Sequence, residues 1–211
     1  MTAPLIAVLD YGIGNLRSAE KALQKVGADA RLTRDPALVA DADAVVLPGV
    51  GAFGACMDAL RGAALESVVH DAVDSGRPFL GICVGMQMLF DDSDENPDAR
   101  GLGIIPGSVR WIPVGVKRPQ MQWNKLRIVR PDPVLSGPEL ADVEGGPWVY
   151  FVHSLHGVPR DADDVVATCD YGSDLNAVFR RDNVGATPFH PAKSGSAGLA
   201  LLRNFVNGVA R

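Results

Sequence analysis

Strand-like and helix-like hydrophobic patterns alternate along the first half of the chain. Short apolar runs predict buried strands at residues 5–9, 44–47 and 79–82, and a further strand fits residues 30–33. After the first run, apolar side chains recur at the spacing of one helical face, at Leu16, Ala19, Leu23 and Val26. Strands that alternate with amphipathic helices are typical of a parallel sheet with helices packed on it.

The second half of the chain is rich in Gly and Pro and predicts short strands, of which Trp148–Ser154 is the clearest. Residues 165–169 and 176–179 are expected to pair as antiparallel neighbours, and residues 184–187 to form a last short strand. Gly198–Val206 closes the chain as an amphipathic helix. We find no repeat and no linker, so we expect a single domain over residues 1–211. Its expected fold class is α/β, a three-layer sandwich around a mixed, mostly parallel central sheet.

Composition narrows the class of protein. The 211 residues are 47% apolar and 21% charged, which is ordinary for a globular domain and excludes a disordered or fibrous chain. The net charge of −5, without a basic stripe, argues against nucleic acid or an anionic membrane as a partner. No run is long enough to span a bilayer, and the first residues lack the basic start of a signal peptide. We therefore expect a cytoplasmic protein.

The cysteines and histidines show no metal-binding spacing. Cys56, Cys83 and Cys169 form neither a CxxC pair nor an even disulfide set, so we expect three free thiols. The four histidines likewise show no zinc spacing. We expect no metal and no cofactor.

One stretch carries the clearest chemical signal. The apolar run Phe79–Ile82 ends in Gly81-Ile-Cys83-Val-Gly85, and a helix is predicted to start at Val84. Glycines that flank a cysteine between a strand and a helix are typical of a sharp turn that presents a nucleophile. The first N–H groups of such a helix favour a thiolate, so we expect a lowered pKa for Cys83. The alternative is a buried structural cysteine.

Two other polar segments allow more than one interpretation. The glycine-rich segment Pro48–Phe53 follows a strand and precedes a helix, so its N–H groups could bind an oxyanion, or it could be only a tight connection. Gly12-Ile-Gly14 suggests a dinucleotide motif, but Arg17 stands where the third glycine belongs. We interpret the acidic run Asp91–Asp98 as a solvated surface loop.

A cysteine nucleophile needs a base, which the fold rather than sequence adjacency brings close. His190 is the best candidate, because it follows the last predicted strand in a loop stiffened by Pro188 and Pro191. His153, at the end of another strong strand, is the alternative.

The motifs around these residues resemble one known family. Gly81-Ile-Cys83-Val-Gly-Met-Gln87, together with Phe189-His190-Pro191, resembles the Cys/His glutaminase domain of the triad-type glutamine amidotransferases. Three further motifs are similar to the histidine-pathway branch, the glutaminase subunits of imidazole glycerol phosphate synthases: Asp10-Tyr-Gly-Ile-Gly-Asn15, Met121-Gln-Trp-Asn124 and Tyr150-Phe-Val-His-Ser154. The resemblance covers nearly the whole chain and implies a flavodoxin-like α/β fold.

The resemblance implies that Cys83 attacks the side-chain amide of glutamine and releases ammonia, with His190 acting first as base and then as acid. It also implies that the N–H of Val84 binds the oxyanion, joined by the N–H of Val50 once the turn Gly49-Val50-Gly51 rearranges.

The same resemblance assigns binding residues and a partner. Gln87 and the backbone near His153 and Ser154 would hold glutamine. Ammonia would pass to a (β/α)8-barrel cyclase in a heterodimer, across a contact near Asn15, Met121 and Trp123.

Three positions depart from the family pattern, and the mildest is Leu155, where relatives usually carry Tyr after His-Ser. The family ends in Gln-Phe-His-Pro-Glu-Lys-Ser, whereas this chain carries Pro188 and Ala192 in place of the Gln and the Glu. The missing Glu is the third triad member, which orients the imidazole and stabilises its charged form. An active glutaminase is therefore weighed against a glutaminase-weak scaffold for an ammonia-using cyclase, with a stand-alone thiol hydrolase as a third possibility. Another carboxylate, such as Asp182, could replace the Glu.

Overall fold

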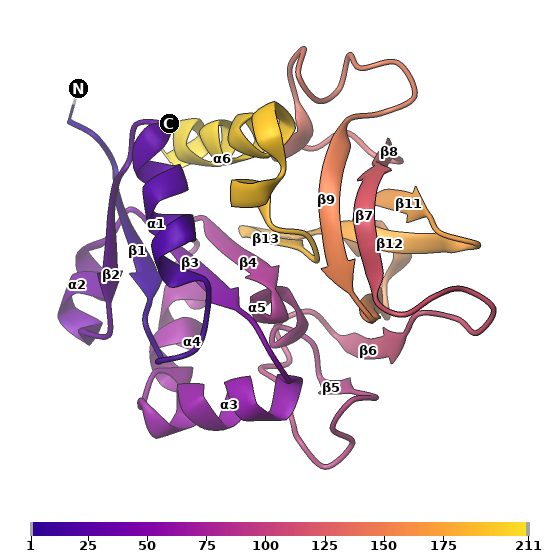
Figure 1. Ribbon diagram of the computed structural model, residues 1–211. Helices are drawn as coiled ribbons and strands as arrows, with labels where there is room; N and C mark the ends of the chain where they lie inside the picture. The colour runs from indigo at the N-terminus through magenta and orange to yellow at the C-terminus, as the bar shows by residue number, and fades with distance from the viewer. Residues whose placement is uncertain (1, 210–211) are drawn as a thin grey trace.

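The computed structural model describes residues 2–209 (Figure 1). An eight-stranded sheet forms the centre, in the order β2-β1-β3-β4-β13-β12-β11-β8. Its strands are β1 (Leu5–Leu9), β2 (Asp29–Thr33), β3 (Ala44–Gly49), β4 (Phe79–Cys83), β8 (Arg127–Ile128), β11 (Val165–Asp170), β12 (Asp174–Arg181) and β13 (Val184–Thr187).

The central sheet is parallel on one side and antiparallel on the other. Strands β2, β1, β3, β4 and β13 pair in parallel, whereas β12, β11 and β8 continue the sheet in antiparallel fashion. The predicted mixed, mostly parallel α/β fold is therefore confirmed. The expected antiparallel pair is also confirmed, because β11 pairs with β12 from Asp170 opposite Asp174 to Val165 opposite Phe179.

Two small sheets pack beside the antiparallel strands β11 and β12 of the central sheet. One holds β10 (Leu155–Pro159), β6 (Gly107–Trp111) and β5 (Asp92–Ser93), and the other pairs β7 (Gln120–Lys125) with β9 (Trp148–His153). In Figure 1, β7 and β9 stand side by side above β6 and β5. Short strands were expected in this Gly- and Pro-rich part of the chain, and they are found there.

Helices cover both faces of the central sheet. They are α1 (Leu16–Lys25), α2 (Pro36–Asp41), α3 (Phe53–Gly62), α4 (Glu66–Asp74), α5 (Val84–Gln87) and α6 (Gly195–Val209). Three short 3₁₀ turns cover Pro133–Leu135, Ala162–Asp164 and Pro191–Lys193. In Figure 1, α1 and α6 lie together above the sheet, and α3 and α4 lie below it.

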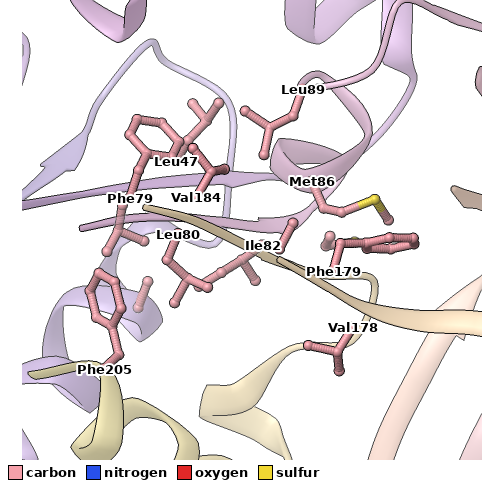
Figure 2. Close-up of a cluster of buried hydrophobic side chains, with 14 of the residues drawn as sticks. Leu47, Phe79, Leu80, Ile82, Met86, Leu89, Val178, Phe179, Val184 and Phe205 are labelled. Atoms are coloured by element: carbon pink, nitrogen blue, oxygen red, sulfur yellow. The ribbon is translucent and has the colours of Figure 1, made fainter. Parts of the chain in front are cut away.

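The core is built on both sides of the central strand β4. Alternation along a strand sends successive side chains to opposite faces, and Figure 2 shows Leu80 on the side of Phe205 from α6 and Phe79 on the side of Leu47. These four side chains are at most 3% exposed. A strand that is buried on both faces needs apolar residues at every position. The sequence of β4 is therefore a continuous apolar run.

Within residues 2–209, no helix is long and apolar enough to cross a membrane. The same residues contain no group of three or more His, Cys, Asp or Glu side chains placed to hold a metal ion.

Candidate active site

The predicted strand–turn–helix at Cys83 is confirmed. Strand β4 ends at Cys83 and α5 begins at Val84. Cys83 has φ +58° and ψ −117°, a conformation that residues with a Cβ rarely adopt and that costs about 1–3 kcal/mol. Strain of this kind persists where surrounding structure enforces it, and it is common at functional sites.

The glycines beside Cys83 are required by close backbone approach. A Cβ on Gly85 would lie 1.9 Å from the Leu47 carbonyl oxygen, and a Cβ on Gly81 would lie 3.0 Å from the Gly85 carbonyl oxygen. The turn Gly81–Gly85, which we call the elbow, therefore packs directly on the neighbouring strand β3. This contact leaves no space for a side chain at Gly85.

Cys83 and His190 open into the same pocket, although 107 residues separate them in the sequence. The pocket has a volume of about 360 Å³. Its other lining residues are Val50, Gly51, Val84, Gln87, Glu95, Pro119, Val152, His153, Ser154, Leu155 and Lys193. Most residues expected at the site are thus brought together here. Gly49, Asn15 and Ala192 lie outside this lining but line a small cavity that His190 also borders. Met121 and Trp123 lie on β7.

The backbone around His190 is held by two hydroxyl groups. Thr187 Oγ1 donates to the Phe189 carbonyl oxygen at 3.1 Å, and Ser194 Oγ donates to the His190 carbonyl oxygen at 2.9 Å. Ser194 Oγ also accepts from the Tyr150 N–H at 3.1 Å. These contacts fix the loop after β13 against β9, so the main chain at His190 is well supported.

Burial keeps both groups of the Cys83–His190 pair uncharged. It raises the pKa of Cys83 to about 11, against the opposing effects of the Val84 N–H and Lys193. Burial, assisted by the charge of Lys193, lowers the pKa of His190 to about 4. The expected low pKa of Cys83 is therefore wrong for this state, since a four-residue helix offsets little of the desolvation. At neutral pH, the pocket therefore holds a neutral imidazole and a protonated thiol.

His153, the alternative base, has its ring nitrogens engaged. A neutral imidazole has one N–H, so the Nδ1–H of His153 donates to the Leu155 carbonyl oxygen at 2.7 Å, and Nε2 lies 2.9 Å from the side-chain amide of Gln120. Burial lowers the pKa of His153 to about 4. With both nitrogens held by protein groups, the ring ties three strands together and has no free position from which to take a proton from Cys83.

The acidic run Asp91–Asp98 contributes to the site, and its interpretation as a purely solvated loop is wrong. Glu95 Oε2 accepts from the Phe53 N–H at 2.7 Å, and Asn96 Oδ1 accepts from the Gly54 N–H at 2.9 Å. Both therefore cap the first turn of α3, and Glu95 also lines the pocket. A sequence signal existed, because Ala52 precedes α3 and cannot cap it with a side chain.

Gln87 carries an unused acceptor within the pocket. Its side chain is 5% exposed, and its Oε1 atom is buried without a hydrogen-bond partner among the described residues. An unpaired buried acceptor is costly unless a ligand completes it. This observation favours a ligand that donates a hydrogen bond at Gln87.

Ala192 leaves an unfilled space behind His190. A small cavity of about 10 Å³, roughly one water in size, lies between the ring and the start of α1. The described residues that line it include Asn15, Ser18 and Ala192 but no carboxylate. Asp182 does not replace the missing Glu, because it lies before β13 and lines a separate pocket with Asn183 and Phe205.

Comparison with known proteins agrees with this geometry. The family model for class-I glutamine amidotransferases matches residues 7–209. Imidazole glycerol phosphate synthase subunit HisH of Syntrophotalea carbinolica is 50% identical over 208 residues, which cover 95% of this chain and 98% of the relative. The protein of the same name from Methanothermobacter thermautotrophicus is 50% identical over 202 residues, covering 96% and 98%.

Solved structures agree on the fold. A putative GMP synthase component from Thermoplasma acidophilum has a TM-score of 0.74 at 20% identity, covering 100% of this chain and 96% of the other. A structure described as a glutamine amidotransferase has a TM-score of 0.75 at 21% identity, covering 98% and 99%. The chain belongs to the class-I glutamine amidotransferase family.

Proposed function

We propose that this protein is the glutaminase subunit of an imidazole glycerol phosphate synthase and supplies ammonia for histidine biosynthesis. The observation that carries the proposal is the shared pocket of Cys83 and His190, with the nucleophile held at a strained elbow. The relatives named for this synthase match almost from end to end, which supports this branch of the family over others.

The proposed reaction uses the neutral thiol and the neutral imidazole. His190 takes the thiol proton as Cys83 Sγ attacks the side-chain amide carbon of glutamine. The resulting imidazolium gives this proton to the departing nitrogen, so that ammonia leaves and a glutamyl thioester remains. Water, deprotonated by His190, then attacks the thioester, and the proton returns to Cys83 as glutamate is released. The N–H of Val84, and that of Val50 after the turn rearranges, would stabilise the oxyanion.

The charges in the pocket suit a free amino acid. Glu95 brings a carboxylate and Lys193 brings an ammonium group to the pocket wall. A glutamine zwitterion offers one charge of each sign, and its groups include donors that can satisfy the unpaired Gln87 oxygen. We propose that these three side chains, with the backbone around His153 and Ser154, select glutamine.

We further propose that the partner is a (β/α)8-barrel cyclase and that the two chains form a heterodimer in the cytoplasm. Met121 and Trp123 on β7 are 61% and 48% exposed, which is unusual for large apolar side chains and favours a protein contact. Asn15, at the start of α1, is the third expected contact residue.

A glutaminase-weak scaffold is a second candidate, because the residues between 2 and 209 that line the cavity behind His190 include no carboxylate. Both candidates can be tested by reconstituting the complex with its cyclase and supplying either glutamine or an ammonium salt. We expect product formation with both nitrogen sources, and we expect Cys83→Ala to abolish only the glutamine-dependent rate. Synthesis from ammonium alone by the unmodified complex would favour the scaffold.

A further inference from the structure

Two buried side chains outside the pocket hold the glycine-rich turn Pro48–Gly51. Tyr11 Oη donates to the Pro48 carbonyl oxygen at 2.7 Å, and Cys56 Sγ donates to the Val50 carbonyl oxygen at 3.2 Å. Tyr11 is 4% exposed and Cys56 is fully buried. The turn is therefore held at two carbonyls, one on either side of Gly49.

Neither donor has another evident role at the site. Tyr11 and Cys56 do not line the pocket that contains Cys83. Burial raises the pKa of both groups, so each keeps its proton at neutral pH and can donate. Removing Tyr11 Oη would take a partner from the buried Pro48 carbonyl, and removing Cys56 Sγ would take one from the partly buried Val50 carbonyl. A buried carbonyl that loses its donor is costly.

The turn is packed tightly against the elbow. Gly49 pairs with Cys83 across the two parallel strands. A Cβ on Gly49 would lie 2.6 Å from the Gly85 N and 2.8 Å from Tyr11 Oη. The turn Pro48–Gly51 is thus in close contact with both the Tyr11 hydroxyl and the elbow. A displacement of this turn would therefore also displace Cys83.

We propose that Tyr11 and Cys56 are positioning residues for the glutaminase reaction, which hold the Pro48–Gly51 turn in place beside Cys83. This inference rests on the proposed function for its kinetic consequence. Its structural consequence, a turn that loosens when either donor is removed, is independent of any activity.

The kinetic test compares Tyr11→Phe, Cys56→Ala and Cys56→Ser in the reconstituted complex. In the proposed reaction the peptide between Gly49 and Val50 turns so that the Val50 N–H meets the oxyanion, and the two hydrogen bonds hold the peptides on either side of it. Loss of a direct oxyanion donor lowers kcat by about 10²–10³-fold, so loosening these flanking peptides should cost about tenfold or more. We expect this loss in kcat with glutamine for Tyr11→Phe and Cys56→Ala, with KM changed by less than about threefold. Cys56→Ser retains an O–H donor and should recover most of the lost rate. Synthesis from ammonium should be unchanged.

The matched control is Cys169→Ala, a substitution at a second buried free cysteine, on β11. It should leave the glutamine-dependent kcat unchanged. If Cys56→Ser is no better than Cys56→Ala, or if kcat stays at the unmodified value in both Tyr11→Phe and Cys56→Ala, the positioning role is overturned and the two side chains serve only core packing.

Amide hydrogen exchange supplies the second measurement and needs no turnover. Exchange in the segment 48–53 should accelerate in Tyr11→Phe and Cys56→Ala but not in Cys169→Ala. Unchanged exchange in this segment would overturn the inference even if the proposed glutaminase function holds. Faster exchange in a protein that hydrolyses no glutamine would support the inference while the proposed function fails.

Discussion

At the scale of single residues, the main departure is that none of the described residues lining the small cavity behind His190 carries a carboxylate. In the proposed reaction, the imidazole becomes positively charged when it takes the proton of Cys83. Burial and the nearby Lys193 both disfavour that charge, as the lowered pKa of His190 indicates. A Glu at position 192 would oppose both effects and restrict the ring, which is the usual role of the third triad member.

We therefore predict that Ala192→Glu, combined with Pro188→Gln, raises the glutamine-dependent rate. The expected gain is about tenfold to a thousandfold, or roughly 1.4 to 4 kcal/mol at about 1.36 kcal/mol per decade. The added carboxylate should also raise the pKa of His190. Because the base must be neutral, we expect the acid limb of the kcat/KM profile near pH 4 in the unmodified protein and at a higher pH in the Glu variant.

Ala192→Gln with the same Pro188 change is the matched control, because it fills the space without a charge. It should leave the acid limb in place. If the Glu variant shows no gain in rate and no shift in this limb, the missing carboxylate does not limit the reaction.

At the scale of elements, the contact between β3 and the elbow demands a glycine. We predict that Gly85→Ala lowers the free energy of unfolding by about 3 kcal/mol, because its Cβ would lie 1.9 Å from the Leu47 carbonyl oxygen and α5 and β3 must move apart. Gly208→Ala in α6 is the control. Its Cβ meets nothing within 4 Å, so it should stabilise the helix by about 0.5–1 kcal/mol. Urea unfolding measures both, and equal effects would contradict the packing argument.

The elements were predictable where the signal is local. The strand that ends at Cys83 and the α1 and α6 helices follow from apolar runs and helical spacing, and the flanking glycines indicate the sharp turn. The role of Glu95 was not predictable, because its carboxylate accepts a hydrogen bond from the N–H of Phe53, the first residue of α3, which lies 42 positions away in the sequence. The pKa of Cys83 was mispredicted for a related reason: the local helix favours a thiolate, whereas burial comes from elements distant in sequence.

At the scale of the whole molecule, the three sheets share one hydrophobic core. Buried side chains from β1, β6, β9, β11 and α6 belong to a single cluster. This continuity supports the expected single domain over residues 1–211, which we retain as a proposal. A shared core also means that groups buried at the site influence the stability of the entire fold.

We predict from this coupling that the protein loses stability as the pH falls from about 6.5 to about 4. Burial lowers the pKa of His153 from 6.5 to about 4, so in this window the unfolded chain binds a proton that the folded chain does not. Stability from this residue is present above pH 6.5 and is lost as the pH falls. At about 1.36 kcal/mol per pKa unit, the loss is about 3 kcal/mol. Urea unfolding between pH 7 and pH 4 should show a smaller decrease for His153→Gln than for the unmodified protein, since carboxylate contributions cancel in the comparison. Parallel decreases in the two proteins would show that His153 does not titrate in this way.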